Sequence, residues 1–128
     1  MNPLMLLYKN GWFDKFARKE KISDKALCDA IKRAEQGLID ADLGGGVIKQ
    51  RIARPGEGKS GGYRTIILYR MQDRAVFVYG FAKSHRENLS ADELVDYRIA
   101  AKLVLGLTEA QIEVEVKSGR WTEVNCDD

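Results

Sequence analysis

The sequence predicts an α+β domain in which helices pack against an antiparallel sheet. Three observations support this class. Apolar residues repeat with a helical period near both ends of the chain, the middle alternates with a period of two, and turn residues separate these segments. A length of 128 residues suits one domain with one sizeable core, and no repeat or linker divides it. We therefore expect residues 1–128 to form a single domain.

Two helices are expected in the N-terminal region. Residues 11–20 give the first helix one apolar face, formed by Trp12, Phe13, Phe16 and Ala17. The second helix follows Ser23, a good N-cap, and its apolar residues repeat at i, i+3, i+4 and i+7 from Leu27. Gly37 fits the position just past the end of this helix. Residues 38–46 then predict a loop that closes on three glycines.

Three strands are expected to follow as an antiparallel meander. Residues 47–54 alternate between apolar and basic side chains, which is typical of a half-buried strand. A turn-rich loop is expected at residues 55–62, because this segment is dominated by glycine and proline. Residues 63–71 and 75–81 are rich in aromatic and β-branched residues, and a short hairpin loop at residues 72–74 joins them.

Two capping boxes predict the C-terminal helices. A Ser-x-x-Glu box at residues 90–93 opens a helix that ends at Gly106. A Thr-x-x-Gln box at residues 108–111 opens a shorter helix that reaches about Ser118. Residues 121–124 predict a last strand or an ordered tail. The predicted order of elements is therefore α-α-β-β-β-α-α.

Composition excludes several classes of protein. With 45% hydrophobic and 31% charged residues the chain is expected to be folded rather than disordered. Its apolar runs are too short for a transmembrane helix or a signal peptide, so we expect a cytoplasmic protein without membrane contact. Cys28 and Cys126 are then expected to be reduced thiols. Two cysteines and one histidine are too few for a structural zinc site, and we expect no metal and no cofactor.

Positive charge is concentrated in the middle of the chain. Residues 44–86 carry nine Lys/Arg and two Asp/Glu, a net charge of +7. Residues 87–128 carry four and ten, a net charge of −6. Such a basic block in a nearly neutral protein indicates an anionic partner that docks on one surface. The alternative is a solvated basic face that binds nothing.

Residues 53–60 (ARPGEGKS) resemble a relaxed Walker A phosphate-binding loop. A true P-loop needs a helix directly after it, because the N-terminal amides of that helix bind the phosphate. Here Lys59 and Ser60 are followed by two glycines and a predicted strand, so nucleotide hydrolysis is disfavoured. Backbone amides and Lys59 on a glycine-rich loop can still bind a phosphodiester.

Basic side chains of the meander are expected to converge, because same-face residues of neighbouring antiparallel strands lie side by side. They are Lys49, Arg51, Lys59, Arg64, Lys83, His85 and Arg86. Clustered cations repel one another, so their segregation indicates a site for a polyanion. The rings of Tyr63, Tyr69 and Tyr79 can stack on nucleic-acid bases, and the alternative for them is burial in the core.

RNA is the polyanion whose chemistry these groups suit. Cleavage by a neighbouring 2′-hydroxyl needs a base, an acid, and cations that stabilise the phosphorane. Arg64 suits the scissile phosphate, because a guanidinium can donate two parallel hydrogen bonds to it. Lys49, Lys83 or His85 suits the proton transfers, with a plain solvent-exposed loop residue as the alternative for His85. The chain lacks a carboxylate cluster, so metal-dependent nuclease chemistry is not expected.

Three ordered segments resemble the RelE/HigB-like toxins of bacterial type II toxin–antitoxin systems. The segments are LIDADLGGGVIKQRIAR (residues 38–54), PGEGKSGGYRTIILYR (55–70) and VYGFAKSHRENLSADEL (78–94). The resemblance covers roughly residues 12–105, so residues 107–128 are an extension without an assigned role. It implies a small helix–sheet domain that cleaves mRNA without a metal, usually on the translating ribosome. It also implies a cognate antitoxin, which in HigB-like systems is a helix-turn-helix protein.

Residues are carried over from the family by position. Arg64 matches the strand arginine that contacts the scissile phosphate, and Lys49 with Arg51 matches a basic pair on the preceding strand. Lys83 and Arg86 match the basic segment after the third strand. The predicted catalytic set is Arg64, Lys83, His85 and Arg86, and the predicted RNA-binding set is Lys49, Arg51, Arg54, Lys59 and Tyr63. Ser84 departs from RelE, which has an arginine there, and Tyr97 lies within a predicted helix rather than matching the family's C-terminal catalytic tyrosine.

These observations lead to one leading hypothesis and two alternatives. The leading hypothesis is a cytoplasmic mRNA endonuclease that inhibits translation and is neutralised by an antitoxin. The first alternative is a non-catalytic module that binds RNA or the ribosome. The second is a degenerate toxin that is kept for complex formation with an antitoxin.

Overall fold

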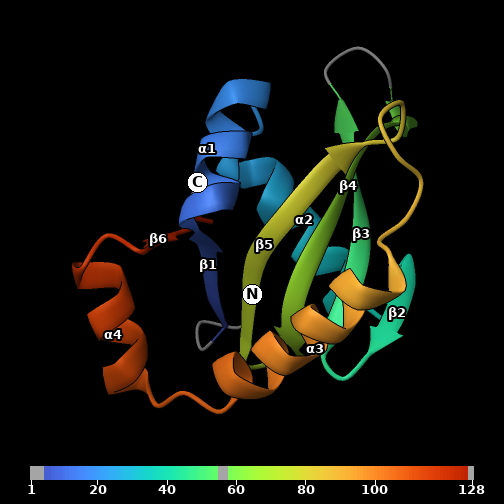
Figure 1. The fold of residues 1–128 in the computed structure, drawn as a ribbon. Coiled ribbons are helices and arrows are strands. Elements are labelled where there is room, and N and C mark those ends of the chain that lie inside the picture. The colour runs from blue at the N-terminus through green and yellow to red at the C-terminus, as the bar shows by residue number, and fades with distance from the viewer. Residues whose placement is uncertain (1–4, 55–57, 127–128) are drawn as a thin grey trace.

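The computed structural model describes residues 5–54 and 58–126, without the side chains of residues 58–60. These residues form a six-stranded sheet with helices on both faces (Figure 1). In chain order the elements are β1 (Leu6–Asn10), α1 (Gly11–Glu20), α2 (Asp24–Glu35), β2 (Ala41–Gly44), β3 (Val47–Arg54), β4 (Gly58–Arg70), β5 (Arg74–Ala82), α3 (Ala91–Leu105), α4 (Glu109–Lys117) and β6 (Trp121–Glu123). The predicted α+β class is confirmed.

The strands lie in the order β2-β3-β4-β5-β1-β6, so the predicted meander β3-β4-β5 forms the middle of the sheet. Its pairs are antiparallel, as expected. β1 adds to β5 in parallel, and β6 then pairs antiparallel with β1. The predicted order of elements was incomplete, because it lacked β1 and β2 and left β6 open. In β1 three successive residues are buried, so the strand has no period-two alternation to reveal it.

The segments predicted as loops are partly strands. Residues 41–44 form the edge strand β2 rather than part of a loop, and β4 begins at Gly58 rather than at Tyr63. Gly62 permits this extension of β4. A Cβ atom there would lie 2.0 Å from the carbonyl oxygen of Ile52, beside an irregularity in the β3–β4 pairing. The residue after Lys59 therefore continues a strand and not a helix, which agrees with the argument against a Walker A loop.

The helices begin where their caps predict. The side chain of Ser23 accepts a hydrogen bond from the backbone of α2. In the capping box of α3 and in that of α4, the N-cap side chain accepts from the backbone amide of the third helical residue, and the side chain of that residue accepts from the N-cap amide. α1 is capped by Asn10, whose side-chain oxygen accepts from the amide of Phe13 at 2.8 Å. The rings of Trp12 and Phe13 both contact Phe16 on the predicted apolar face of α1, although Trp12 is 46% exposed.

Each face of the sheet has its own hydrophobic core. One core lies between the sheet and the helices α1 and α2, and it contains Phe13, Leu27, Ile48, Ile67 and Phe77. The other lies between the sheet and the helices α3 and α4, and it contains Val47, Ile66, Leu68, Val76, Ala101 and Ile112. The alternation of β3 and β4 therefore assigns successive residues to opposite cores.

Gln50 is a buried polar residue that connects β3 to α2. Its side-chain nitrogen donates to the carbonyl oxygens of Ala30 and Leu38, at 2.9 Å and 3.3 Å. Its side-chain oxygen accepts from the backbone amide of Asp40 at 2.6 Å. A fully buried amide costs free energy unless its hydrogen bonds are made, so these three contacts fix the segment between α2 and β2.

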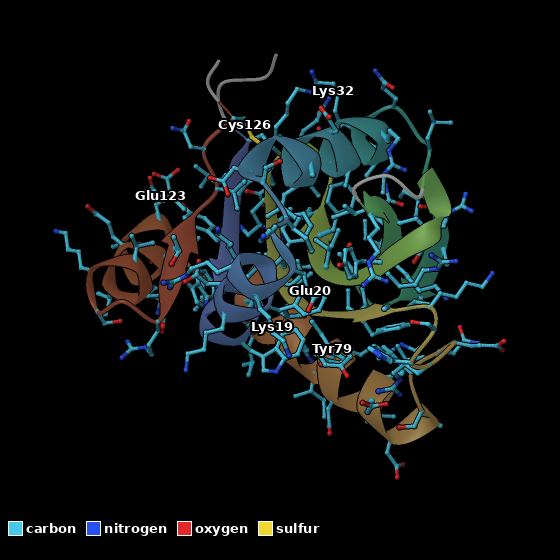
Figure 2. All side chains as sticks on the ribbon, turned by 90° about the horizontal axis from the view of Figure 1, so that it is seen from above. Lys19, Glu20, Lys32, Tyr79, Glu123 and Cys126 are labelled. Atoms are coloured by element: carbon cyan, nitrogen blue, oxygen red, sulfur yellow. A yellow bond between two sulfur atoms is a disulfide. The ribbon has the colours of Figure 1, made fainter. Side chains whose placement is uncertain are left out.

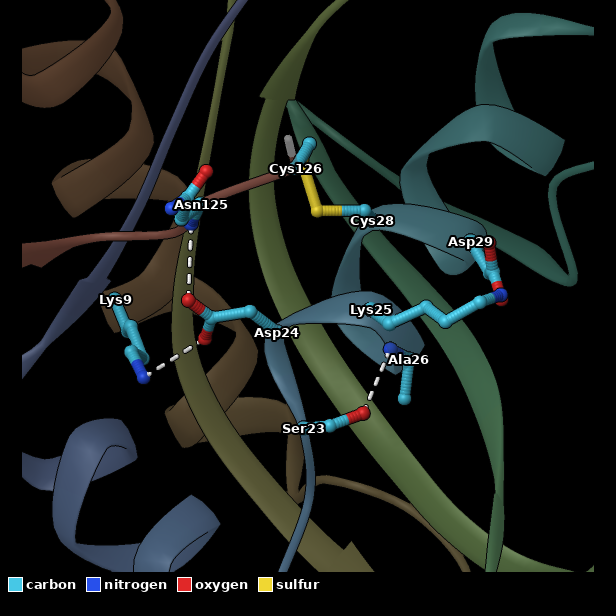
Figure 3. The surroundings of a disulfide bond; sticks show 9 residues. All are labelled: Lys9, Ser23, Asp24, Lys25, Ala26, Cys28, Asp29, Asn125 and Cys126. Atoms are coloured by element: carbon cyan, nitrogen blue, oxygen red, sulfur yellow. Dashed lines mark hydrogen bonds and ion pairs between the residues drawn. A yellow bond between two sulfur atoms is a disulfide. The ribbon is translucent and has the colours of Figure 1, made fainter. Parts of the chain in front are cut away.

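Cys28 and Cys126 form a disulfide, and the expectation of reduced thiols is thus corrected (Figure 3). The bond joins α2 to the segment after β6, across a sequence separation of 98 residues. Neighbouring contacts hold the same region together. The amide of Asn125 donates to Asp24 at 2.9 Å, and Lys9 lies 3.2 Å from the same carboxylate. The sequence shows two distant cysteines but not their proximity in space, so composition alone could not reveal the pair.

No helix within the described part of the chain is long and apolar enough to cross a membrane.

Replacing both cysteines by serine is expected to lower the free energy of unfolding by about 2–4 kcal/mol under oxidising conditions. The physical reason is that the disulfide closes a long loop and so restricts the unfolded chain. Urea denaturation of the oxidised protein and of the variant measures the difference. With a thiol reductant the two proteins should have the same stability, and a difference that persists in reductant would contradict this assignment.

Candidate nucleic-acid interface

The candidate site lies on the sheet face that α3 partly covers (Figure 1). α3 packs over Leu68 and Val76, toward the β4–β5 turn. Arg51 and Arg64 lie on the same strands farther from that turn, and they are direct partners in the β3–β4 ladder. The sheet brings these two predicted residues together as expected. Two like charges opposite each other destabilise a sheet, so the pair is not explained by stability.

Both guanidinium groups have nitrogen atoms that are buried and unpaired. Within residues 5–54 and 58–126, Nε of Arg51 and Nη1 of Arg64 have no hydrogen-bond partner. Buried polar groups of native proteins are nearly always paired, and an exception calls for a ligand or another explanation. Two unpaired donors on neighbouring strands are an arrangement suited to an anion with several oxygen atoms, such as a phosphate.

Arg51 is held in place from the strand edge. Its backbone amide donates to Asp40 at 2.7 Å, and its Nη2 lies 3.3 Å from the same carboxylate. Burial alone would raise the pKa of Asp40, but the hydrogen bonds from Arg51 and the charge of Arg33 outweigh it and lower the pKa. Asp40 is therefore ionised at neutral pH. It neutralises part of the charge of Arg51 and leaves Nε without a partner.

Lys49 lies two residues before Arg51 in β3, on the same face of the strand, and is partly exposed. Its Nζ donates to the side-chain oxygen of Asn88 at 2.9 Å. Asn88 belongs to the segment between β5 and α3, so this contact ties that segment to the face. Because the partner is neutral, Lys49 keeps its full positive charge toward a ligand.

Arg86 lies over the aromatic part of the face. Its Cζ is 5.5 Å from the ring centre of Phe81, the residue that pairs with Arg64 in the β4–β5 ladder. It is also 5.9 Å from the ring of Tyr79, and it donates to the Tyr79 hydroxyl at 3.3 Å. Arg86 and Arg64 therefore both neighbour Phe81.

Arg86 is not a free cation, because Glu93 binds it. Its Nη2 and Nη1 donate to the two carboxylate oxygens at 2.5 Å and 3.1 Å. The hydrogen bond from Arg86 lowers the pKa of Glu93 to about 2, and the backbone of Ser90 contributes to the shift. The same pair raises the pKa of Arg86. The sequence pattern indicates Glu93 as part of the capping box of α3 but does not reveal this second role.

Lys83 and His85 lie on the exposed turn that follows β5. Among the described residues their side chains have no hydrogen bond or ion pair. The backbone amide of His85 donates to the carbonyl of Ala82 at 2.9 Å, which fixes the turn but not the imidazole. The structure therefore places both residues beside the end of the strand that carries Phe81, without a contact to Arg64.

Tyr63 is a correction to the predicted RNA-binding set. It is 2% exposed and faces the core under α1, where its hydroxyl donates to Glu20 at 2.7 Å. A buried ring cannot stack on a base. Arg54 lies over this ring, 5.6 Å from its centre, and so is placed with Tyr63 rather than with Arg51 and Arg64. Lys59 is within β4, but its side chain is outside the described part of the structure.

The other two tyrosines differ in their surroundings. Tyr69 is buried like Tyr63, and its hydroxyl donates to Glu35. Tyr79 remains on the candidate face, where its ring lies 4.6 Å from that of Trp12 and 6.2 Å from that of Tyr97. Burial raises the pKa of Tyr97 to about 12. Burial in the core, the alternative for the tyrosines, is confirmed for Tyr63 and Tyr69. The exposed ring of Trp12 adds a further aromatic side chain beside Tyr79, which the helical pattern of α1 did not indicate.

No group of three or more His, Cys, Asp or Glu side chains that could hold a metal ion occurs in the described residues. The charged groups of the face are instead guanidinium and ammonium groups. Arg51 and Arg86 pair with Asp40 and Glu93, whereas no carboxylate of the described residues pairs with Lys49 or Arg64. The arrangement can bind and stabilise a polyanion through hydrogen bonds and charge.

Comparison with known protein families places the chain in one of them. The family model described as RelE toxin of RelE / RelB toxin-antitoxin system matches residues 5–124. The match therefore includes α4 and β6, beyond the three segments that carried the resemblance in the sequence. No curated protein matches the chain.

Replacing Arg64 by methionine is expected to leave the free energy of unfolding unchanged within about 0.5 kcal/mol, or to raise it. The change removes a partly buried guanidinium with an unpaired nitrogen and keeps the apolar stem. Arg74→Met is the matched control, because Nη1 of Arg74 donates to the carbonyls of Val104 and Leu107 at 3.0 Å and 2.7 Å. The control should lose about 2 kcal/mol in urea denaturation. An equal loss in both variants would show that Arg64 has a structural role.

Glu93 is expected to titrate at about pH 2 in the folded protein, and Arg86→Ala should raise its pKa toward the ordinary 4.5. Because the folded-state pKa is lowered, the stabilising contribution is complete above about pH 4.5. It is lost as the pH falls toward 2. Carbon-detected NMR of the Glu93 carboxyl measures this directly. Arg98→Ala, which removes a different α3 arginine bonded to Leu43, should leave the titration unchanged.

Proposed function

This chain belongs to the RelE toxin family, and from that membership we propose that it is an endoribonuclease that cleaves mRNA and inhibits translation. As a family member it is the toxin of a toxin–antitoxin system, with an antitoxin as its partner. The single observation that best supports the cleavage activity is the pair Arg51 and Arg64, whose buried, unpaired donors face the same side of the sheet.

The proposed reaction is attack of a ribose 2′-oxygen on the adjacent phosphorus, with departure of the 5′-oxygen. A base takes the 2′-hydroxyl proton, and an acid supplies a proton to the leaving oxygen. The products are a 2′,3′-cyclic phosphate and a 5′-hydroxyl end. Arg64 and Arg51 donate hydrogen bonds to the non-bridging oxygens, whose negative charge grows in the transition state. This chemistry requires no metal and no cofactor.

The proton transfers are proposed for the exposed residues near the pair. Lys49 shares the face with Arg51, and its neutral partner Asn88 leaves the ammonium charge uncompensated. Lys83 and His85 lie on the turn after β5 and are free to approach a bound strand. Arg86 is proposed to add positive charge beside the phosphate while Glu93 fixes its orientation.

The aromatic residues next to the basic pair suit the bases of a single strand. Tyr79 lies between Trp12 and Tyr97, and Trp12 has a partly exposed ring. Stacking on such rings adds affinity without strict sequence preference. We propose mRNA on the ribosome as the substrate, a helix-turn-helix antitoxin as the neutralising partner, and the cytoplasm as the location.

A non-catalytic RNA- or ribosome-binding module is the second candidate. The observation in its favour is that Lys83 and His85 have no side-chain contact in the described structure that would hold them near Arg64. Such a module would arrest translation without cutting RNA. A degenerate toxin, kept for binding its antitoxin, would do neither.

Arg64→Ala is expected to reduce mRNA cleavage at least a hundredfold, in line with the loss of a transition-state donor. Controlled expression in bacteria, with mapping of new mRNA 5′ ends within minutes, measures the effect. Arg70→Ala is the matched control, because Arg70 lies on the same strand but pairs with Asp73 in the turn. It should cleave like the unaltered protein.

The outcomes separate the candidates. New ends inside coding regions with the unaltered chain and Arg70→Ala, but not with Arg64→Ala, support the endoribonuclease. Growth arrest without new ends supports the binding module. Soluble, folded protein with neither effect supports the degenerate toxin. Undiminished cleavage by Arg64→Ala would contradict the assigned role of the basic pair.

A further inference from the structure

The helix α3 has apolar side chains on two opposite faces. Its inner face packs on the sheet, where Ala101 is fully buried. Its outer face carries Val95, Ile99 and Leu103, which are 51%, 58% and 66% exposed. Residues four apart on a helix are neighbours, so these three side chains form one continuous apolar stripe. A surface helix normally has a single apolar face, and a helix that is apolar on both sides is normally covered on both. The stripe therefore calls for a partner.

The stripe lies away from the candidate nucleic-acid interface. In Figure 2 the orange helix α3 is at the outer edge of the molecule, beside Tyr79. The inner face of α3 carries Tyr97, whose ring lies 6.2 Å from that of Tyr79. Val95, Ile99 and Leu103 are on the opposite side of the helix. A partner on the stripe would therefore leave Tyr79 and the rest of the interface uncovered.

Two charged residues flank the stripe symmetrically. Asp96 and Lys102 are exposed, and neither forms an ion pair or a hydrogen bond with a described residue. Each lies three residues from Ile99, and the helical repeat places them on opposite flanks of the stripe. Opposite charges at equal distances from the middle of an apolar stripe make the surface complementary to a second copy of itself. This is the requirement for an interface with twofold symmetry, whereas a partner of different sequence needs no such symmetry.

The direction in which the two helices cross follows from the charges. Ridges of residues four apart pack on each other with the helix axes at about 50°. If the twofold axis runs along the stripe through Ile99, each Asp96 lies beside Lys102 of the second copy, and two ion pairs form. If the axis runs across the stripe, Asp96 instead approaches Asp96 of the second copy, and Lys102 approaches Lys102. The first arrangement is attractive and the second is repulsive, so the charges select the first.

We propose that α3 is the interface of a homodimer, in which the stripes of Val95, Ile99 and Leu103 pack on each other and Asp96 pairs with Lys102 of the second copy. The stripe is short compared with the interfaces of permanent dimers, so the association is reversible. It is independent of RNA cleavage and persists in Arg64→Ala.

Sedimentation equilibrium of the full chain, without RNA, tests the interface over a hundredfold range of protein concentration. The unaltered chain should pass from monomer to dimer as its concentration rises. Ile99→Asp should weaken the dimer at least tenfold, because it places two like charges in the middle of the apolar contact. Val114→Asp is the matched control, since Val114 is also 58% exposed but belongs to α4. It should dimerise like the unaltered chain.

Charge reversal tests the predicted pairing. Asp96→Lys and Lys102→Asp should each weaken the dimer at least threefold, because each variant brings like charges together at both contacts. The double variant, with both changes, should dimerise like the unaltered chain, because it restores opposite charges at both positions. This rescue also shows that the exposed substitutions leave the fold intact.

Three results would overturn the proposal. The first is a monomer at every concentration, which would leave the stripe to a partner of another kind. The second is a dimer that Ile99→Asp and Val114→Asp weaken equally or not at all. The third is a double charge variant that dimerises no better than the single variants. None of these results bears on RNA cleavage, which is measured separately with Arg64→Ala.

Discussion

The hydrogen bonds of the buried Gln50 amide determine how the rest of the candidate site is held. Two of them bind the carbonyls of α2 and of the segment after it, and the third binds the amide of Asp40. With its backbone fixed, Asp40 presents its carboxylate to both the amide and the guanidinium of Arg51. Arg51 in turn lies opposite Arg64 in the ladder. A chain of contacts thus runs from a neutral amide in one core to the basic pair on the other face of the sheet.

The strict alternation of β3 and β4 makes this arrangement possible, but it also separates residues that look equivalent in the sequence. Tyr63 and Arg64 are neighbours, yet one is enclosed under α1 and the other faces the site. The site face is less stable than it could be, because it keeps unpaired guanidinium nitrogens where apolar side chains would pack. Such a conflict between stability and local chemistry is typical of functional sites, where the surrounding core compensates for it.

Most of the fold was predictable from the sequence because its signals are local. Caps at Ser23, Ser90 and Thr108 set the starts of three helices, and period-two alternation set the central strands. β1 was missed because burial on both faces removes the alternation, and the disulfide was missed because proximity is not a local property. In the site, strand parity predicted that Arg51 and Arg64 lie on one region of the sheet, and the structure shows that they are direct ladder partners. It could not show that Glu93 binds Arg86, since that contact depends on the path of the segment between β5 and α3.

Glu93 belongs to two structures at once, and this has a thermodynamic consequence. One of its oxygens accepts from the amide of Ser90 and thereby caps α3, while the same carboxylate accepts from Arg86. The breaking of the Arg86–Glu93 ion pair and the unwinding of the first turn of α3 are therefore linked equilibria. A ligand that separates Arg86 from Glu93 changes the electrostatics of that turn, and unwinding of the turn releases the guanidinium of Arg86. The order of the first turn of α3 and the positive charge that Arg86 presents on the basic face are thus thermodynamically coupled.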